Sequence, residues 1–133
     1  MNKSKANTHE DAVQKFVFVL LSLDVTRSIE YESVLAQAIS ARTLDLEVEI
    51  YFTGRAIDWL LLGVAEAQNC VTQAQMTLLS LMEQAVELGV RFSPCSPALQ
   101  GEDKPLLDFV SEPVGATYLI EVISHRDTQV LSY

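Results

Sequence analysis

Continuous apolar stretches alternate along the chain with segments in which apolar residues recur every three or four positions. Residues 15–23 are apolar and rich in aromatic and β-branched side chains, which predicts a central strand buried on both faces. Residues 28–42 have helical spacing with polar residues between, which predicts an amphipathic crossover helix. Residues 46–53 alternate at first and become apolar later, so they predict a second strand, broken by Gly54.

The middle of the chain predicts two further helices. Residues 57–66 are expected to supply the helix of a second βα unit. Thr72, followed three positions later by Gln75, makes a capping-box pattern. It precedes a helical apolar stripe over residues 76–88 that Gly89 is expected to end.

The last third of the chain predicts a third strand and the elements that close the fold. Residues 90–95 are short and apolar, so Cys95 ends the third strand. Ser96 is a good N-cap and Pro97 a good first helical residue, which predicts a helix directly after the cysteine. The remaining expectations are a short helix and a short fourth strand within residues 106–114, a helix over 115–124 and a terminal strand over 128–133.

Strands that alternate with helices through short connections favour a parallel sheet with helices on both faces. The 133 residues fit one domain. We expect a polar, flexible tail over residues 1–13 and a single domain over residues 14–133.

The charge and composition of the chain argue against several classes of function. Eighteen acidic residues against nine basic ones give a net charge of −9, which disfavours direct binding to nucleic acid or to an anionic membrane surface. No apolar run is long enough for a membrane helix, and no secretory signal is expected at the start. Two cysteines are too few for a disulfide framework, so we expect a cytoplasmic protein.

Candidate chemistry gathers where the predicted strands end, because functional groups of open α/β sheets collect at the carboxyl ends of the strands. Asp24 follows the first strand, Thr53 and Arg55 follow the second, and Cys95 ends the third. Of these, Cys95 is the strong nucleophile, and a helix start beside it favours the thiolate. The alternative is that Cys95 is a small buried hydrophobic residue.

The other polar candidates have simpler alternatives. Arg55 could hold an anion or pair with a thiolate at Cys95, or it could form a surface ion pair with Asp58. Cys70 could be a resolving thiol, but an ordinary loop cysteine is the favoured interpretation, since a disulfide needs close Cα atoms. His125, near the end of the last helix, is expected to complement the helix dipole.

The sequence lacks the residues that several classes of binding site require. Residues 24–28 contain no glycine, so a flavin phosphate loop is not expected there, and GxxxxGK[ST] and GxGxxG are absent. The cysteines and histidines lie at positions 9, 70, 95 and 125, which is no zinc spacing. We therefore expect neither a metal nor an organic cofactor.

Four segments carry a resemblance to a known family. They are GVRFSPCSPAL at residues 89–99, GATYLIE at 115–121, TQVLSY at 128–133 and YFTGR at 51–55. Together they resemble the DsrE/DsrF/TusD type of sulfur-relay protein, in which a short strand ends in a cysteine and a glycine-containing turn begins the last helix. The resemblance extends over residues 14–133. The chain departs from the better-known members in having Pro94 and Pro97 around the cysteine and no second cysteine beside it.

The resemblance implies a three-layer α/β/α sandwich with a five-stranded parallel sheet, assembled into trimers or hexamers. It implies that Cys95 accepts sulfane sulfur as a persulfide from one protein and delivers it to another without a cofactor. We expect Ser96 and Arg55 to be binding residues near this cysteine. The apolar residues 59–62 and 76–88 also favour a homo-oligomer, because they exceed what one sheet face can cover.

Two alternatives stay open. In the first, the protein is a non-catalytic interaction or structural subunit of the same fold, and Cys95 only packs. In the second, Cys70 and Cys95 form a thiol-redox pair.

Overall fold

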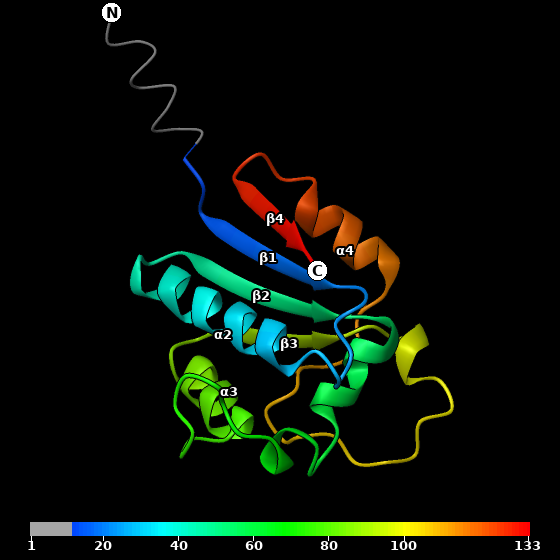
Figure 1. The fold of residues 1–133 in the computed structure, drawn as a ribbon. Helices are drawn as coiled ribbons and strands as arrows, with labels where there is room; N and C mark the ends of the chain where they lie inside the picture. The colour runs from blue at the N-terminus through cyan, green and yellow to red at the C-terminus, as the bar shows by residue number, and fades with distance from the viewer. Residues whose placement is uncertain (1–11) are drawn as a thin grey trace, which may run out of the picture.

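A computed structural model of the chain describes residues 12–133, so all but the last two residues of the predicted tail lie outside the described part. The described residues form a parallel sheet with the strand order β3-β2-β1-β4 (Figure 1). Its strands are β1 (Lys15–Leu20), β2 (Glu47–Phe52), β3 (Arg91–Pro94) and β4 (Thr128–Ser132).

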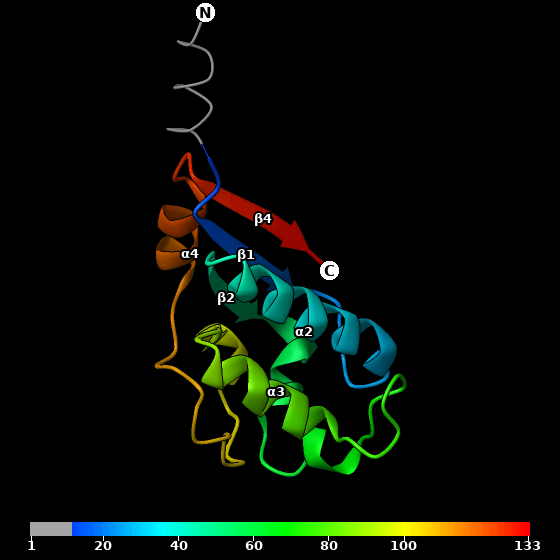
Figure 2. The same ribbon diagram turned by 90° about the vertical axis from the view of Figure 1, so that its left-hand side faces the viewer.

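Within residues 12–133, three α-helices cover the two faces of this sheet. Helices α2 (Ser28–Thr43) and α3 (Leu78–Glu87) pack on one face, and α4 (Ala116–Ile123) packs on the other (Figure 2). The predicted layered α/β architecture is therefore confirmed. No helix within residues 12–133 has the length and apolar character needed to cross a membrane.

Strand β1 lies between β2 and β4 and is buried on both faces, as its unbroken apolar sequence predicts. Phe18 faces α2 and α3, whereas Val17 and Val19 face α4.

The two faces carry cores of very different size. The face of α2 and α3 holds most of the large buried side chains, including Tyr31, Phe52, Trp59 and Phe92. On the face of α4, the fully enclosed cluster consists of Val17, Val19 and Tyr51, and no residue of α4 itself is fully buried. The α4 face therefore has room for polar groups close to the sheet.

The sheet has four strands rather than the five that the resemblance implies. The expected extra strand is reduced to one parallel bridge between Cys95 and Val114 at the outer edge of β3. Pro94 contributes to this, because it has no N–H to donate across that edge. The bridge consists of the Val114 amide donating to the carbonyl of Pro94 and the Ser96 amide donating to the carbonyl of Val114, both at 2.9 Å, and the Ser111 amide adds a bond to the carbonyl of Phe92 at 2.9 Å.

The helix predicted over residues 57–66 is wrong. The chain forms two 3₁₀ segments instead, Gly54–Leu60 and Ala65–Ala67. Trp59 is fully buried and its indole Nε1 donates to the carbonyl of Leu23 at 2.9 Å, so the side chain holds this segment against the core. Gly63, with a φ of 91°, has a left-handed conformation that interrupts a helix.

Helix α3 begins later than the capping-box pattern predicts. Its N-cap is Thr77, whose Oγ1 accepts from the amide of Ser80 at 3.1 Å. Thr72 is used elsewhere, because its hydroxyl donates to the carboxylate of Glu32. The predicted end is confirmed, since Gly89 follows the helix with a φ of 102°.

Candidate functional site

Cys95 lies directly after β3, at the carboxyl edge of the sheet. Its amide donates to the carbonyl of Phe52 at 2.8 Å, so the backbone still follows the sheet at this residue. Its side chain is half-buried and points to the face of α4, where it packs against the cluster of Val17, Val19 and Tyr51. The residue is therefore partly exposed and packs on an apolar cluster.

Tyr51 is the polar member of this cluster. The side chain is 3% exposed, and its hydroxyl donates to the carbonyl of Val114 at 3.5 Å. Burial raises the pKa of the Tyr51 phenol, and hydrogen bonding to the Cys95 side chain and the nearby charges of Cys95 and Glu49 raise it further. The phenol therefore keeps its proton at neutral pH and is available as a donor.

The segment after Cys95 forms a weaker helix start than expected. It is a single 3₁₀ turn, Pro97–Leu99, and the Ser96 side chain makes no capping hydrogen bond. A turn this short has little of the dipole that a full α-helix offers a thiolate. Beside the turn is a hollow of about 540 Å³, lined by Ser96, Pro97, Leu99, Gln100 and Pro113. Ser96 is the residue after Cys95, so the hollow begins one residue beyond the cysteine, and Cys95 itself does not line it.

Arg55 follows β2, the strand next to β3. Its guanidinium Nη2 lies 2.6 Å from Oδ2 of Asp58, so the surface ion pair considered from the sequence is confirmed. The side chain is 73% exposed. An anion-binding role for Arg55 stays a prediction.

Cys70 lies on the other face of the sheet, in the core under α2 and α3. It is 4% exposed, and its Sγ donates to the carbonyl of Thr77 at 3.6 Å. Burial raises the pKa of the Cys70 thiol, and the charge of Glu32 adds to the effect. Because the sheet separates Cys70 from Cys95, the structure favours an ordinary packed cysteine over a resolving thiol.

A buried carboxylate on the Cys95 face was not identified as a candidate from the sequence. Glu49 is 2% exposed and accepts hydrogen bonds from the hydroxyls of Ser93 and Tyr118, the latter at 2.9 and 3.0 Å. Lys15 Nζ lies 3.2 Å away and Arg91 Nε 3.8 Å away. The available signal was a glutamate inside a strand that is otherwise becoming apolar, between Val48 and Ile50.

The cluster of Glu49, Ser93 and Tyr118 connects the sheet to α4. Glu49 precedes Tyr51 by two positions, and Ser93 precedes Cys95 by two, so all four side chains share one face. Tyr118 comes from α4. Its contact with Glu49 fixes the position of this helix over the face that carries the cysteine.

The other candidates have local roles or lie outside the site. Oδ1 of Asp24 accepts from the amide of Thr26 at 2.9 Å and from its hydroxyl, and these bonds lower the pKa of the carboxyl. They make a turn after β1. His125 is exposed just beyond the end of α4, and His9 lies outside the described residues. Within residues 12–133, no group of three or more ligating side chains is placed to hold a metal.

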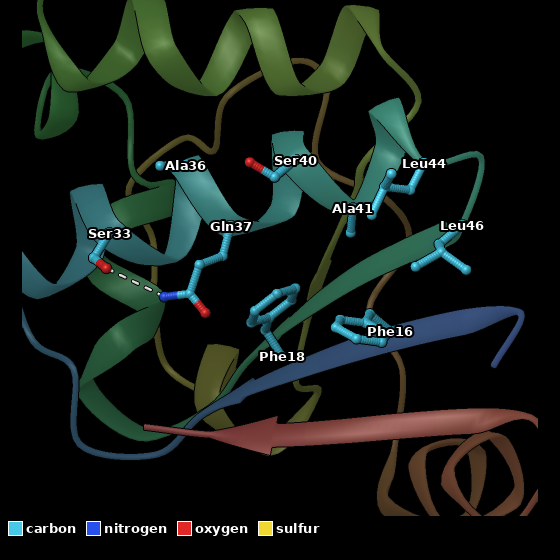
Figure 3. Close-up of a pocket in the computed structure, with 9 residues that line it drawn as sticks. All are labelled: Phe16, Phe18, Ser33, Ala36, Gln37, Ser40, Ala41, Leu44 and Leu46. Atoms are coloured by element: carbon cyan, nitrogen blue, oxygen red, sulfur yellow. Dashed lines mark hydrogen bonds between the residues drawn. The ribbon is translucent and has the colours of Figure 1, made fainter.

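An apolar groove of about 370 Å³ runs between α2 and β1 (Figure 3). Phe16 and Phe18 form its floor, and the Gln37 amide at its rim donates to Ser33 Oγ at 3.2 Å. Phe18 belongs to the core of the α2 face. The groove is therefore on the opposite side of the sheet from Cys95 and is not part of the site.

The sequence matches no protein-family model and no curated protein. Solved structures do match. The ychN protein from E. coli aligns with a TM-score of 0.70 and 20% identity, over 91% of this chain and all of the other. MTH1491, a protein of unknown function from Methanobacterium thermoautotrophicum, aligns with a TM-score of 0.60 and 17% identity, over 90% of this chain and 98% of the other. The chain thus shares the fold of these two proteins, and that fold is consistent with the resemblance to DsrE-like proteins.

Proposed function

We propose that the protein is a DsrE-like sulfur carrier in which Cys95 accepts sulfane sulfur as a persulfide and passes it to a second protein. The observation that carries the proposal is the position of Cys95 at the carboxyl edge of the sheet, where the residue is partly exposed and is followed directly by Ser96, which lines a hollow. The fold shared with the ychN protein also supports the proposal, because a sheet of this kind can hold a thiol at its carboxyl edge.

The chemistry needs one thiolate. The Cys95 thiolate attacks the terminal sulfur of a donor persulfide, R–S–SH, and a new bond forms between that sulfur and Sγ. The S–S bond of the donor breaks, and its electron pair leaves with the donor as R–S⁻. The carrier then holds Cys95–S–SH, and the same exchange in the next step delivers the sulfur to an acceptor thiolate.

The proposed partners are a protein sulfur donor and a protein sulfur acceptor in the cytoplasm. The net charge of −9 supports protein rather than nucleic-acid partners. Ser96 lines the hollow beside Cys95, and Arg55 follows the adjacent strand, so we keep both as binding residues. A homo-oligomer, trimer or hexamer, is part of the proposal, although Trp59, Leu60 and Leu61 are already buried within one chain.

The test is to incubate the protein with a persulfide donor and to weigh it intact. We expect the wild type to gain one sulfur atom that a reductant removes. Cys95→Ser should gain none, and Cys70→Ala, the matched control, should gain sulfur like the wild type. Failure of the wild type to gain sulfur, or equal loading of Cys95→Ser, would contradict the carrier function.

The packing of Cys95 against Val17, Val19 and Tyr51 favours a second candidate, a structural subunit in which the thiol has no chemistry. The two functions differ in the reactivity of the native thiol. Rapid alkylation of Cys95 near neutral pH supports the carrier, whereas resistance until the protein is unfolded supports the structural subunit.

A further inference from the structure

We propose that the Tyr51 hydroxyl is the hydrogen-bond donor that stabilises the Cys95 sulfur as a thiolate, an inference that rests on the carrier function proposed above. Tyr51 then acts directly on the reacting sulfur, whereas its sequence context indicated only that it belongs to a strand.

The sheet register brings the two side chains together. Tyr51 on β2 pairs with Ser93 on β3, and Cys95 is two residues beyond Ser93. Residues two apart on a strand point to the same face, so Tyr51 and Cys95 are diagonal neighbours across adjacent strands. Packing agrees with the register, because Cys95 contacts the buried cluster that contains Tyr51.

The Tyr51 hydroxyl has little else to bind. At 3% exposure the side chain is almost closed to bulk water, and an unsatisfied buried hydroxyl is costly. Its carbonyl partner on Val114 is 3.5 Å away, at the long end of the hydrogen-bond range. Val114 is itself bridged to Cys95, and its carbonyl already accepts from the amide of Ser96 at 2.9 Å, so it does not depend on the Tyr51 hydroxyl for a donor.

The single phenolic proton can therefore turn from the Val114 carbonyl to the sulfur. Rotation about the C–O bond gives up only a long hydrogen bond, and a charged acceptor makes a stronger one. Tyr51 donates this hydrogen bond without transferring its proton. It thereby stabilises the thiolate before attack.

Two other sources of thiolate stabilisation are weak in this site. The turn after Cys95 is a single 3₁₀ turn, and the guanidinium of Arg55 is paired with Asp58. Tyr51 fills the role that the sequence assigned to a helix dipole.

The test is the alkylation of Cys95 by iodoacetamide as a function of pH, with the modified residue located by peptide mass. Tyr51→Phe keeps the buried ring and removes the donor. At pH 7 we expect alkylation to slow by roughly three- to tenfold, the effect of losing one such hydrogen bond. The midpoint of the pH profile should move upward, and the rates should converge at high pH, where the thiol is ionised in both proteins.

Tyr31→Phe is the matched control, because Tyr31 is buried on the other face and its hydroxyl has no hydrogen-bond partner among the described residues. It should leave the profile unchanged. A second variant, Tyr51→3-fluorotyrosine, keeps the size and strengthens the donor, so the midpoint should move downward. This variant decides the matter if Tyr51→Phe does not fold.

Superimposable profiles for the wild type and a folded Tyr51 variant would overturn the inference, as would a change in rate of equal size at every pH. The assay uses no sulfur donor, so its result is separate from that of the loading experiment. A shifted profile without sulfur loading contradicts the carrier function alone, and loading with an unchanged profile contradicts the role of Tyr51 alone.

Discussion

Glu49 shows how one residue can hold a polar group inside a small core. The carboxylate is buried, yet hydroxyls from β3 and α4 and the ammonium of Lys15 surround it. Burial alone would lower the pKa of Lys15, but hydrogen bonding and charge from Glu49, with the charge of Glu47, raise it. The strand thus tolerates a charged residue where apolar neighbours led us to expect only packing.

Neutralising Glu49 should destabilise the protein. Glu49→Gln keeps the shape but leaves Lys15 without its buried counter-ion, so we expect a loss of about 1–3 kcal/mol in the free energy of unfolding. Urea denaturation measures it. Glu47→Gln is the control, because Glu47 contacts the same ammonium at 3.4 Å with a side chain that is 72% exposed. It should cost less than about 0.5 kcal/mol, and equal losses would show that burial is not the cause.

Glu32 should make stability depend on acid pH. Burial would raise the pKa of its carboxyl, but hydrogen bonds from the Thr72 hydroxyl and from the amides of Val71 and Thr72 outweigh this and lower it. A lowered pKa in the folded state means that the ionised group stabilises the native protein above pH 4.5, its ordinary pKa. That stabilisation is lost as the pH falls through the lower folded value.

The measurement compares wild type with Glu32→Gln by urea denaturation at several pH values. The difference in unfolding free energy should be largest near neutral pH and shrink below about pH 4.5. Thr72→Val removes the hydroxyl donor and leaves the two amide donors, so its effect at neutral pH should be smaller. A difference that stays constant with pH would rule out ionised Glu32 as the anchor of this loop.

At the scale of elements, helical spacing predicted the bounds of α2 and α4 within a residue or two, although the buried face of α2 includes Glu32 and leaves Ile29 exposed. The residues around Trp59 were misassigned for a physical reason. Ala56, Ile57, Trp59, Leu60 and Leu61 are all buried within six residues, so the run has no periodic polar face to identify its conformation. The indole bond to Leu23, which holds the segment in place, depends on a residue far away in the sequence.

The start of α3 gives a prediction at this scale. Thr77→Ala removes the side-chain acceptor for the Ser80 amide and should cost about 1 kcal/mol of unfolding free energy, read from the urea midpoint. Gln75, the partner in the capping box that the sequence suggested, is exposed and outside the helix. Gln75→Ala should therefore be nearly neutral. If Gln75→Ala were destabilising and Thr77→Ala nearly neutral, the helix would instead begin at the capping box of Thr72 and Gln75.

At the scale of the whole molecule, the order of strands and helices made the carboxyl edge of the sheet predictable, and Cys95 lies there. Its neighbours were less accessible to sequence analysis, since the pairing of Tyr51 with Cys95 depends on the register of β2 against β3. The missing fifth strand depends on which amides face the outer edge, where Pro94 has none to offer.

The two-sided sheet makes a last prediction about the cysteines. Cys70 is enclosed beneath α2 and α3, whereas Cys95 faces α4, so the native chain cannot bring the sulfurs to bonding distance. Treatment of the native protein with diamide should leave the monomer without an internal disulfide, as judged by intact mass. Any disulfide between chains should disappear in Cys95→Ser and persist in Cys70→Ala.

The same oxidation in denaturant is the positive control, because unfolding removes the sheet that separates the two thiols. An internal disulfide should then form readily. Loss of two hydrogens from the native monomer would contradict the two-sided arrangement and return the thiol-redox pair to consideration. Its absence from the native protein, together with its formation in the unfolded one, would leave Cys95 to act through a single thiol, which is all that persulfide transfer requires.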